Sequence, residues 1–427
     1  MIDVKRLRQD PAGSRASLMR RGDPGLAAIL DEMLDLDRQR RDVLVRGEGL
    51  KAERNAASDE VARRKRAKEP ADDLMERLKA SGDEVKSLDG RLREIEAALD
   101  ERALAVPNFP HEGSPDGDAT ANRVLRAWGT PPKLDFTPKP HWELGPTLGL
   151  FDLPAGGKIT GSGFPLFTGL GAKLGRALAG FMLDLHTREH GYLEVAPPYL
   201  VNRASLIGTG QLPRFAEEIY ACPADDLFLI PTAEVPVTNI HRDEILEASA
   251  LPATYVAYSP CFRREAFSGG KETRGLIRVH QFDKVELVRI VRPEESAAEH
   301  ERMTAHAEAV LQRLELPYRV VELAAGDTGF ASARTYDLEV WAAGVGGWLE
   351  VSSSSTFTDF QARRANIRYR PSPKAKPEFV HTLNASGVAF PRTIIALLEN
   401  NQAADGSVRV PEALVSYLGV DRLHPRA

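Results

Sequence analysis

Charged and aromatic side chains that could bind a nucleotide gather in the stretch CFRREAFSGGKETRGLIRVHQFDKVE, residues 261–286. Its pattern predicts two strands joined by a polar loop, with turn points at Gly269, Gly270 and Gly275. Side chains alternate along a strand, so five side chains of the second strand should share one face. They are Arg278, His280, Phe282, Lys284 and Glu286.

The first strand of this hairpin places Arg263 and Glu265 on one face in the same way. Guanidinium groups, a ring and carboxylates on a single surface have the chemistry to hold a nucleotide beside a small second substrate. The charges alone would favour an ordinary exposed hairpin. The phenylalanine among them and the glycine-rich loop favour a binding site.

Other polar residues lie at the ends of predicted strands. Glu234 follows the apolar strand LFLIP and by itself could be an ordinary loop acid. Four consecutive serines at 352–355 are typical of a linker, but they lie between Leu349-Glu350-Val351 and a predicted strand DFQARR. Arg392 follows Pro391 at a predicted helix N-terminus, where backbone N–H groups favour anions.

Two glycine-rich segments do not fit a phosphate-binding loop. Lys158–Gly171 lacks the G-x-G-x-x-G spacing, and we expect an ordinary loop there. GGKET at 269–273 lacks the first glycine of a P-loop, and Lys271 is followed by glutamate.

The N-terminal quarter predicts a long helical hairpin. A helix starting at Asp23-Pro24 carries an apolar seam, and a second seam follows Pro70. The first seam contains Leu26, Ile29, Met33, Leu36, Arg40, Val43, Gly47, Leu50, Arg54, Ala57 and Val61, and the second Leu74, Leu78, Ser81, Val85, Leu88, Leu92, Ile95 and Leu99. Helices of this length reach about 50–60 Å. Prolines then make residues 106–145 a linker, with a domain boundary near residue 110.

A cluster of cations lies at the tip of this hairpin. Arg63, Arg64, Lys65, Arg66 and Lys68 fall within six positions. A solvated helix face is the alternative to a phosphate-binding surface. Like charges at a turn repel one another, whereas a nucleic-acid backbone would neutralise them.

The bulk composition restricts the class of protein. A length of 427 residues suggests two or three domains, and a net charge of −5 excludes a generally cationic nucleic-acid binder. Cys222 and Cys261 are too few for a disulfide framework or a cysteine-rich zinc site. We expect no membrane insertion and a cytoplasmic location, because no signal peptide and no long apolar run occur.

The order of motifs resembles the bacterial-type seryl-tRNA synthetases of class II. The resemblance rests on Phe-Arg-x-Glu at 262–265 followed by GLIRVHQF at 275–282, and it extends from IDVKRLRQDP to LLENNQ. It implies an α+β fold: an antiparallel sheet flanked by helices, with an N-terminal antiparallel two-helix coiled-coil arm. It also implies a tRNA-binding domain over residues 1–110 and a catalytic domain over 111–427.

The resemblance implies that the hairpin binds ATP. Arg263 would hold the α-phosphate and the serine carboxylate, Glu265 would meet the adenine, and Arg278 would reach the terminal phosphates. Phe282 would stack on the base, and Arg392 would contact the γ-phosphate. The full ATP set is Arg263, Arg264, Glu265, Arg278, Val279, Phe282, Glu350, Val351, Ser352, Ser353 and Arg392.

By the same resemblance, L-serine would contact Thr232, Ala233, Glu234, Arg263, Glu286 and Ser386. Glu350 and Ser353 match the positions that hold the Mg²⁺ bridging the ATP phosphates, and no zinc is expected. The arm, with Arg54 and the tip residues Arg63, Arg64, Lys65, Arg66 and Lys68, would bind tRNA(Ser) and also tRNA(Sec). The helix over 170–190 and the strand before Pro197-Pro198 match the motif at the homodimer interface.

Three alternatives remain open at this stage: an amino acid:carrier-protein ligase, a duplicated synthetase for antibiotic resistance or biosynthesis, and a non-catalytic tRNA-binding paralogue. The long arm argues against the carrier-protein ligase, and the complete set of polar site residues argues against loss of activity. The sequence departs from the family pattern at 341–357 and 385–391, where Ser354, Phe357, Ala385 and Phe390-Pro391 replace the usual residues.

Overall fold

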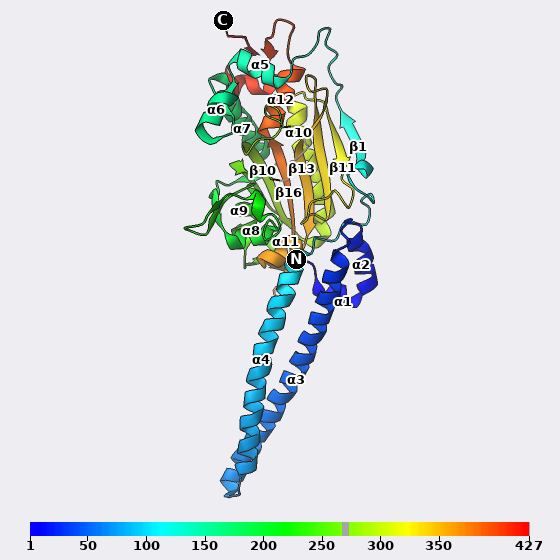
Figure 1. The fold of residues 1–427 in the computed structure, drawn as a ribbon, viewed down its shortest axis with the longest axis vertical. Helices are drawn as coiled ribbons and strands as arrows, with labels where there is room; N and C mark the ends of the chain where they lie inside the picture. The colour runs from blue at the N-terminus through cyan, green and yellow to red at the C-terminus, as the bar shows by residue number, and fades with distance from the viewer. Residues whose placement is uncertain (267–272, 427) are drawn as a thin grey trace. The chain divides into compact units, whose positions relative to one another are not determined.

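The computed structural model describes residues 1–266 and 273–426 (Figure 1). The chain divides into two compact units. Met1–Met19 with Asp23–Pro107 form the first, and Arg20–Gly22 with Asn108–Ala427 form the second. The loop glycines Gly269 and Gly270, and most of the GGKET segment, lie outside the described residues.

The first unit is entirely helical. Two short helices, α1 (Val4–Gln9) and α2 (Pro11–Met19), precede the long helices α3 (Leu26–Ala67) and α4 (Asp72–Ala105). The long helices contain 42 and 34 residues and pack against each other along the arm that the sequence predicts (Figure 1).

The buried seam of α3 differs from the predicted one near its start. Leu30 and Asp37 are buried, whereas Ile29 and Leu36 are only partly buried. A straight helix has 3.6 residues per turn, so a strict alternation of threes and fours drifts away from the contact line. In α4 the prediction fits better, because Leu74, Val85, Ile95 and Leu99 are all buried.

An eight-stranded sheet forms the centre of the second unit, in the order β1-β11-β12-β13-β16-β10-β9-β4. Neighbours are antiparallel except that β4 runs parallel to β9. The strands are β1 (Arg123–Trp128), β4 (Leu193–Glu194), β9 (Ala253–Phe262), β10 (Gln281–Val291), β11 (Tyr318–Glu322), β12 (Arg334–Ala342), β13 (Gly347–Thr358) and β16 (His381–Ala389). This sheet confirms the expected class II fold.

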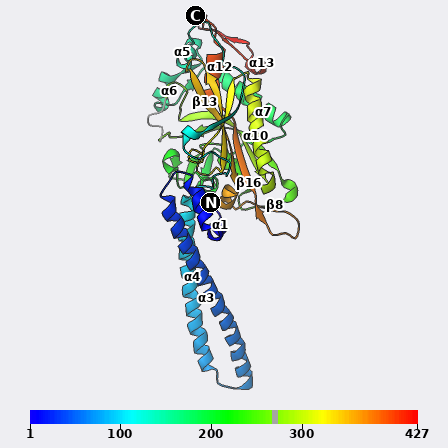
Figure 2. The ribbon, with the colours of Figure 1, turned by 90° about the vertical axis from the view of Figure 1, so that its right-hand side faces the viewer.

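Helices cover one face of this sheet. α7 (Leu170–Arg188) packs against β9 and β10, and α10 (Ser296–Arg313) packs against β13 and β16 (Figure 2). Apolar residues of both helices belong to the main core together with inward side chains of the strands. His300 and Thr304 of α10 bond to Ser354, so Ser353 and its same-face neighbours point to the opposite side of the sheet.

Smaller elements surround the sheet at its two ends (Figure 1). The remaining helices are α5 (His141–Leu148), α6 (Leu153–Thr160), α8 (Arg203–Thr209), α9 (Glu234–Thr238), α11 (Phe360–Ala365), α12 (Phe390–Asn400) and α13 (Glu412–Leu418). The remaining strands are β2 (Phe151–Asp152), β3 (Leu166–Phe167), β5 (Leu200–Asn202), β6 (Ala221–Cys222), β7 (Leu227–Leu229), β8 (Ile245–Glu247), β14 (Arg368–Arg370), β15 (Glu378–Phe379), β17 (Val408–Arg409) and β18 (Arg422–Leu423).

Two local predictions are wrong. DFQARR lies in the helix α11 instead of a strand, because tertiary packing buries Phe360, Gln361, Ala362 and Ala365 together, the two alanines in an apolar cluster with Ile367. Lys158 and its neighbours end the helix α6 instead of forming a loop, since Asp152 caps that helix through the backbone N–H of Ala155. Within the described residues, no helix combines the length and apolarity needed to span a membrane.

Candidate active site

The hairpin of β9 and β10 carries the predicted nucleotide-binding residues, but its second strand starts later than expected. Gln281 pairs with Phe262, and the residues before Gln281 are not in a strand. The backbone of Arg263 donates to the carbonyl of His280 at 2.8 Å, and His280 in turn donates to the carbonyl of Gly163 at 2.8 Å. The His280 ring lies 5.3 Å from that of Phe164. His280 therefore leaves the face on which the alternation placed it.

A cavity of about 150 Å³ lies beside this hairpin. The Arg263 guanidinium lies 5.1 Å from the centre of the Phe282 ring, and Arg278 forms a 2.9 Å ion pair with Glu265. The residues that line the cavity include Arg263, Glu265, Arg278, Val279, Phe282, Lys284, Glu350, Val351, Ser386 and Arg392. The cavity thus combines an aromatic ring with three guanidinium groups, which suits a base and its phosphates.

Arg392 closes one side of this cavity from the first turn of α12. Its guanidinium donates to the carbonyl of Ile277 at 3.1 Å and to the carbonyl of Glu350 at 2.8 Å. The strand β16 leads directly into α12, so Pro391 fits the helix start as predicted. Arg392 therefore joins the segment before β10 to β13 at the cavity edge.

Three of the residues expected to contact ATP do not line this cavity: Ser353 lines the neighbouring cavity instead, and Arg264 and Ser352 line neither. Arg264 follows Arg263 and points the other way: it lies 4.5 Å from the centre of the Tyr220 ring and donates to the carbonyl of Ile219 at 3.2 Å. Ser352 is buried and donates to the carbonyl of Ser386 at 2.6 Å. The expectations for Arg264 and Ser352 assumed that a residue contacts ATP because its neighbour in the sequence does. Neighbouring residues in an extended chain, however, point to opposite sides.

A second cavity, of about 370 Å³, adjoins the first. It contains acids from three elements: Glu234 opens α9, Glu286 lies on β10 and Glu350 lies on β13. Its polar lining residues include Thr232, Glu234, Arg263, Lys284, Glu286, Ser353, Asn384 and Ser386. Ala233 is absent from this lining and packs with Val237 in a small apolar cluster instead.

Glu234 has an unusual environment. The Nε2 of Gln361 donates to its Oε1 at 2.6 Å, and Thr382 holds Gln361 through a further hydrogen bond at 2.7 Å. Burial and the nearby charge of Glu286 raise the pKa of Glu234 to about 7. Gln361 is fully buried in α11, and no sequence pattern pointed to it because α11 was expected to be a strand.

Glu286 is held by two neighbours to which the sequence analysis gave no role. Asn384 donates to its Oε1 at 2.9 Å, and Lys284 forms an ion pair with its Oε2. Lys284 also donates to the hydroxyl of Thr232 at 2.9 Å. Strand alternation placed Lys284 on the face of Glu286, and it could have indicated Asn384 as well, because Asn384 precedes Ser386 by two residues.

Oxygen donors converge where β12 and β13 pair. The Ser353 hydroxyl lies 2.6 Å from Asp337 Oδ1 and 3.3 Å from Glu350 Oε1. Burial and the nearby Glu350 raise the pKa of Asp337 well above its usual range. No three His, Cys, Asp or Glu side chains within the described residues form a metal cage. Two carboxylates and a hydroxyl are nevertheless the donor type that a hard divalent cation accepts when phosphates complete its shell.

The two cavities meet at four residues that line both: Arg263, Lys284, Glu350 and Ser386. Two of them are cations, one is a carboxylate and one is a hydroxyl. This junction could bring a phosphate from the first cavity against a carboxylate from the second. The arrangement therefore suits a reaction between a nucleotide and a small zwitterion.

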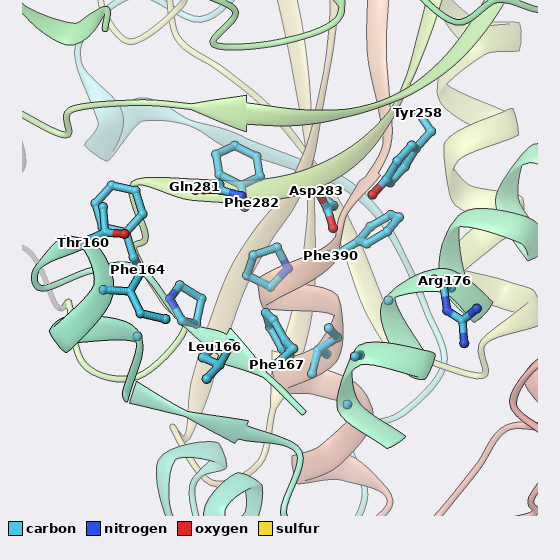
Figure 3. Close-up of a pocket in the computed structure, with 18 residues that line it drawn as sticks. Thr160, Phe164, Leu166, Phe167, Arg176, Tyr258, Gln281, Phe282, Asp283 and Phe390 are labelled. Atoms are coloured by element: carbon cyan, nitrogen blue, oxygen red, sulfur yellow. The ribbon is translucent and has the colours of Figure 1, made fainter. Parts of the chain in front are cut away.

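A third cavity, also of about 370 Å³, lies beside α6, α7 and the start of α12 (Figure 3). Its walls are aromatic, with Phe164, Phe167, Tyr258 and Phe390 around the Asp283 side chain (Figure 3). Asp283 and Tyr258 share a hydrogen bond, and burial raises the pKa of the Asp283 carboxyl. This cavity contains none of the residues that join the other two.

The cations at the arm tip have acidic neighbours. Arg63 and Arg64 form ion pairs with Glu60 at 2.7 and 3.1 Å, and Arg64 forms another with Asp73 at 3.2 Å. Arg63 and Arg64 lower the pKa of Glu60 to about 2. Repulsion among the arginines is thus partly offset, so it cannot by itself indicate a polyanion partner.

Two family models match the chain. The seryl-tRNA synthetase N-terminal domain covers residues 1–110. The class II core domain of the synthetases for G, H, P, S and T covers residues 220–401.

Curated relatives match over the full length. The chain is 53% identical to a serine–tRNA ligase of Carboxydothermus hydrogenoformans over 427 residues, with complete coverage of both chains. It is 54% identical to a serine–tRNA ligase of Gemmatimonas aurantiaca, covering 98% of this chain and 99% of that one.

Solved structures agree with these matches. A seryl-tRNA synthetase of Pyrococcus horikoshii complexed with ATP superposes with a TM-score of 0.96 at 38% identity, covering 100% of both chains. A cytoplasmic serine–tRNA ligase of Naegleria fowleri in complex with AMP superposes with a TM-score of 0.90 at 26% identity, covering 100% of this chain and 99% of that one.

Proposed function

The chain belongs to the seryl-tRNA synthetase family of class II, and from that premise we propose how its residues perform the work of a serine–tRNA ligase. The enzyme activates L-serine with ATP to form seryl-adenylate and pyrophosphate, and it transfers the seryl group to tRNA(Ser). The observation that best supports our assignment is the meeting of two polar cavities at Arg263 and Ser386.

ATP binds in the smaller cavity. Phe282 stacks on the adenine, with the Arg263 guanidinium 5.1 Å from its ring centre, and Glu265 accepts from the base while pairing with Arg278. Arg278 and Arg392 meet the terminal phosphates. The Arg392 contacts with Ile277 and Glu350 fix its guanidinium before the nucleotide arrives, which lowers the entropic cost of binding.

L-serine binds in the second cavity. Glu286 and Glu234 accept from its ammonium and hydroxyl groups, with Thr232 and Ser386 as further partners. A cavity that hydrogen-bonds a hydroxyl rejects alanine strongly, because alanine leaves buried polar groups without partners. Gln361 and Asn384 hold the two carboxylates in place and thereby support this discrimination.

Adenylate formation is an in-line attack by the serine carboxylate on the α-phosphate. The carboxylate is already a competent nucleophile, so positioning and neutralisation of charge supply the catalysis. Arg263 lies at the junction of the cavities and contacts both the carboxylate and the α-phosphate. The γ-phosphate leaves as part of pyrophosphate, whose charge Arg392 offsets.

Glu350 and Ser353 would hold Mg²⁺, and Asp337 would support Ser353 through their 2.6 Å hydrogen bond. When bound, the ion neutralises phosphate charge and orients the polyphosphate. Three oxygen donors on adjacent strands fit such an ion.

We assign tRNA recognition and serine activation to different domains of the chain. Residues 1–110 form the tRNA-binding domain and residues 111–427 the catalytic domain, with a linker over about 106–145. The arm grips tRNA(Ser) through backbone contacts from Arg54 and the tip residues Arg63, Arg64, Lys65, Arg66 and Lys68. We assign tRNA(Sec) as a second substrate of the same arm residues. We also propose a cytoplasmic location, because both tRNAs are found there.

The enzyme works as a homodimer. Exposed apolar side chains gather on α6, β3 and the segment from β4 to β5, which includes the predicted interface. They are Ile159, Leu166, Leu193, Tyr199 and Leu200, with Ile159 exposed by 73% and Leu193 by 62%. A second copy would cover these side chains and the aromatic cavity of Figure 3 beside them.

Replacing Arg263 by alanine tests this assignment. The variant should lose serine-dependent ATP–pyrophosphate exchange by about 10²-fold or more, because the α-phosphate loses its cation. Its neighbour Arg264 gives a matched control: Arg264→Ala should keep exchange within about threefold of the wild type, since that guanidinium lies against Tyr220 outside the cavities. Equal loss in both variants, or normal activity of Arg263→Ala, would refute the assignment.

A further inference from the structure

Among the residues that the structure describes, Lys284 is the one cation at the junction of the two cavities that the proposed function leaves without a role. Its side chain comes from β10 and is only 5% exposed. Buried lysines need a charge partner, and lysine stems are long and flexible enough to exchange one partner for another.

The position of its ammonium group is informative. Lys284 Nζ donates to the Thr232 hydroxyl at 2.9 Å and forms an ion pair with Glu286 Oε2. The other oxygen of Glu286 is already held by Asn384 at 2.9 Å. Thr232 and Glu286 therefore present one place for a primary ammonium group, and Lys284 fills it.

Serine brings a second primary ammonium group to the same acceptors. Two ammonium groups within hydrogen-bond reach of one carboxylate oxygen would repel each other strongly in so buried a site. Serine also brings a carboxylate, which needs a cation at the junction with the phosphates. An exchange of one ammonium for the other would meet both requirements without changing the charge of the cavity.

We propose that Lys284 holds the place of the serine ammonium between Thr232 and Glu286, and that serine displaces it toward the junction, where it contacts the serine carboxylate and the α-phosphate. This inference rests on the proposed function of the two cavities. It makes Lys284 a second cation of adenylate formation beside Arg263, available only after serine has bound. Serine thereby completes the charge arrangement on which its own activation depends.

Serinol separates the two halves of this exchange, because it carries the ammonium and hydroxyl groups of serine but no carboxylate. In Lys284→Met the competing ammonium is gone, so serinol should bind about tenfold tighter than to the wild type, measured by isothermal titration calorimetry at pH 8. Serine-dependent ATP–pyrophosphate exchange should fall by about 10²-fold in the same variant, through kcat. If Lys284 only held Glu286 in place and never moved, Lys284→Met would weaken both serinol binding and pyrophosphate exchange. Weaker or unchanged serinol binding in the variant would therefore overturn the inference.

A measurement on the unaltered enzyme keeps the test independent of folding. Serinol should raise the rate of reductive methylation at Lys284, followed by peptide mass spectrometry, whereas a constant or lower rate would contradict displacement. Lys139, which is exposed and lies outside the three cavities, serves as the internal reference. Failure of the wild type to bind serinol or to exchange pyrophosphate with serine would instead refute the proposed function itself.

Discussion

Glu234 and Glu286 lie in one small cavity, and their proximity makes the ionisation of Glu234 sensitive to pH. The pKa of Glu234 is raised to about 7 by burial and by Glu286. Below that pH the Glu234 carboxyl is neutral and attracts the serine ammonium less. We predict that kcat/KM for serine falls toward acid pH, approaching tenfold per pH unit below about pH 7, in steady-state exchange assays.

Glu234→Gln provides the control for this prediction. The amide keeps an oxygen for Gln361 but cannot ionise, so the variant should show lower kcat/KM for serine and no inflection near pH 7. An inflection that persists unchanged in the variant would show that another group titrates there.

At the level of residues, the structure brings together most of the side chains that the sequence singled out, but the sequence missed their supporting groups. Arg263, Glu286 and Arg392, which the motifs indicated, all line the two cavities. It erred where a neighbour in sequence was assumed to share a contact, as with Arg264. Gln361 could not be found from the sequence, because its role depends on packing between elements far apart in the chain.

At the level of elements, the arm should affect tRNA charging without affecting chemistry on serine. Neutralising Arg63, Arg64 and Arg66 together by glutamine should lower kcat/KM for tRNA(Ser) by about 10-fold or more, because phosphate contacts are lost. Serine-dependent pyrophosphate exchange should stay unchanged, since the arm belongs to a separate compact unit. Equal loss of both activities would contradict this division.

Glycines weaken the arm helices without a packing requirement. A Cβ at Gly49 or Gly82 would meet nothing within 4 Å. Glycine costs about 1 kcal/mol of helix stability relative to alanine, so Gly82→Ala should slow hydrogen exchange in nearby α4 amides by about fivefold.

Gly210 is the opposite case, because its φ of +94° caps α8 and a Cβ would lie 3.2 Å from Ala331. Gly210→Ala should lower the Tm.

The elements themselves show where sequence periodicity is sufficient. The arm was predicted because its pattern extends over many residues. α11 was mistaken for a strand because six residues allow either period, and tertiary packing decided between them. The start of β10 depended on the contact between His280 and Gly163, which only the folded chain provides.

At the level of the whole molecule, the exposed apolar side chains predict association between two copies. Leu193→Glu places a charge on β4, where the side chain is 62% exposed, and should shift the enzyme toward monomer in sedimentation velocity experiments. Val124→Glu, on β1 at the other edge of the sheet, should leave the dimer intact. Dissociation by Val124→Glu alone would place the interface on β1 instead.

The most direct test of the account is ATP–pyrophosphate exchange with each of the twenty amino acids in the absence of tRNA. Two cavities joined at Arg263 and Lys284, with Glu234 and Glu286 in the second, should support exchange with serine. Alanine, which lacks the hydroxyl, should be rejected by about 10³-fold or more in kcat/KM. Exchange with a different amino acid, or with none, would contradict the assignment of the second cavity to serine.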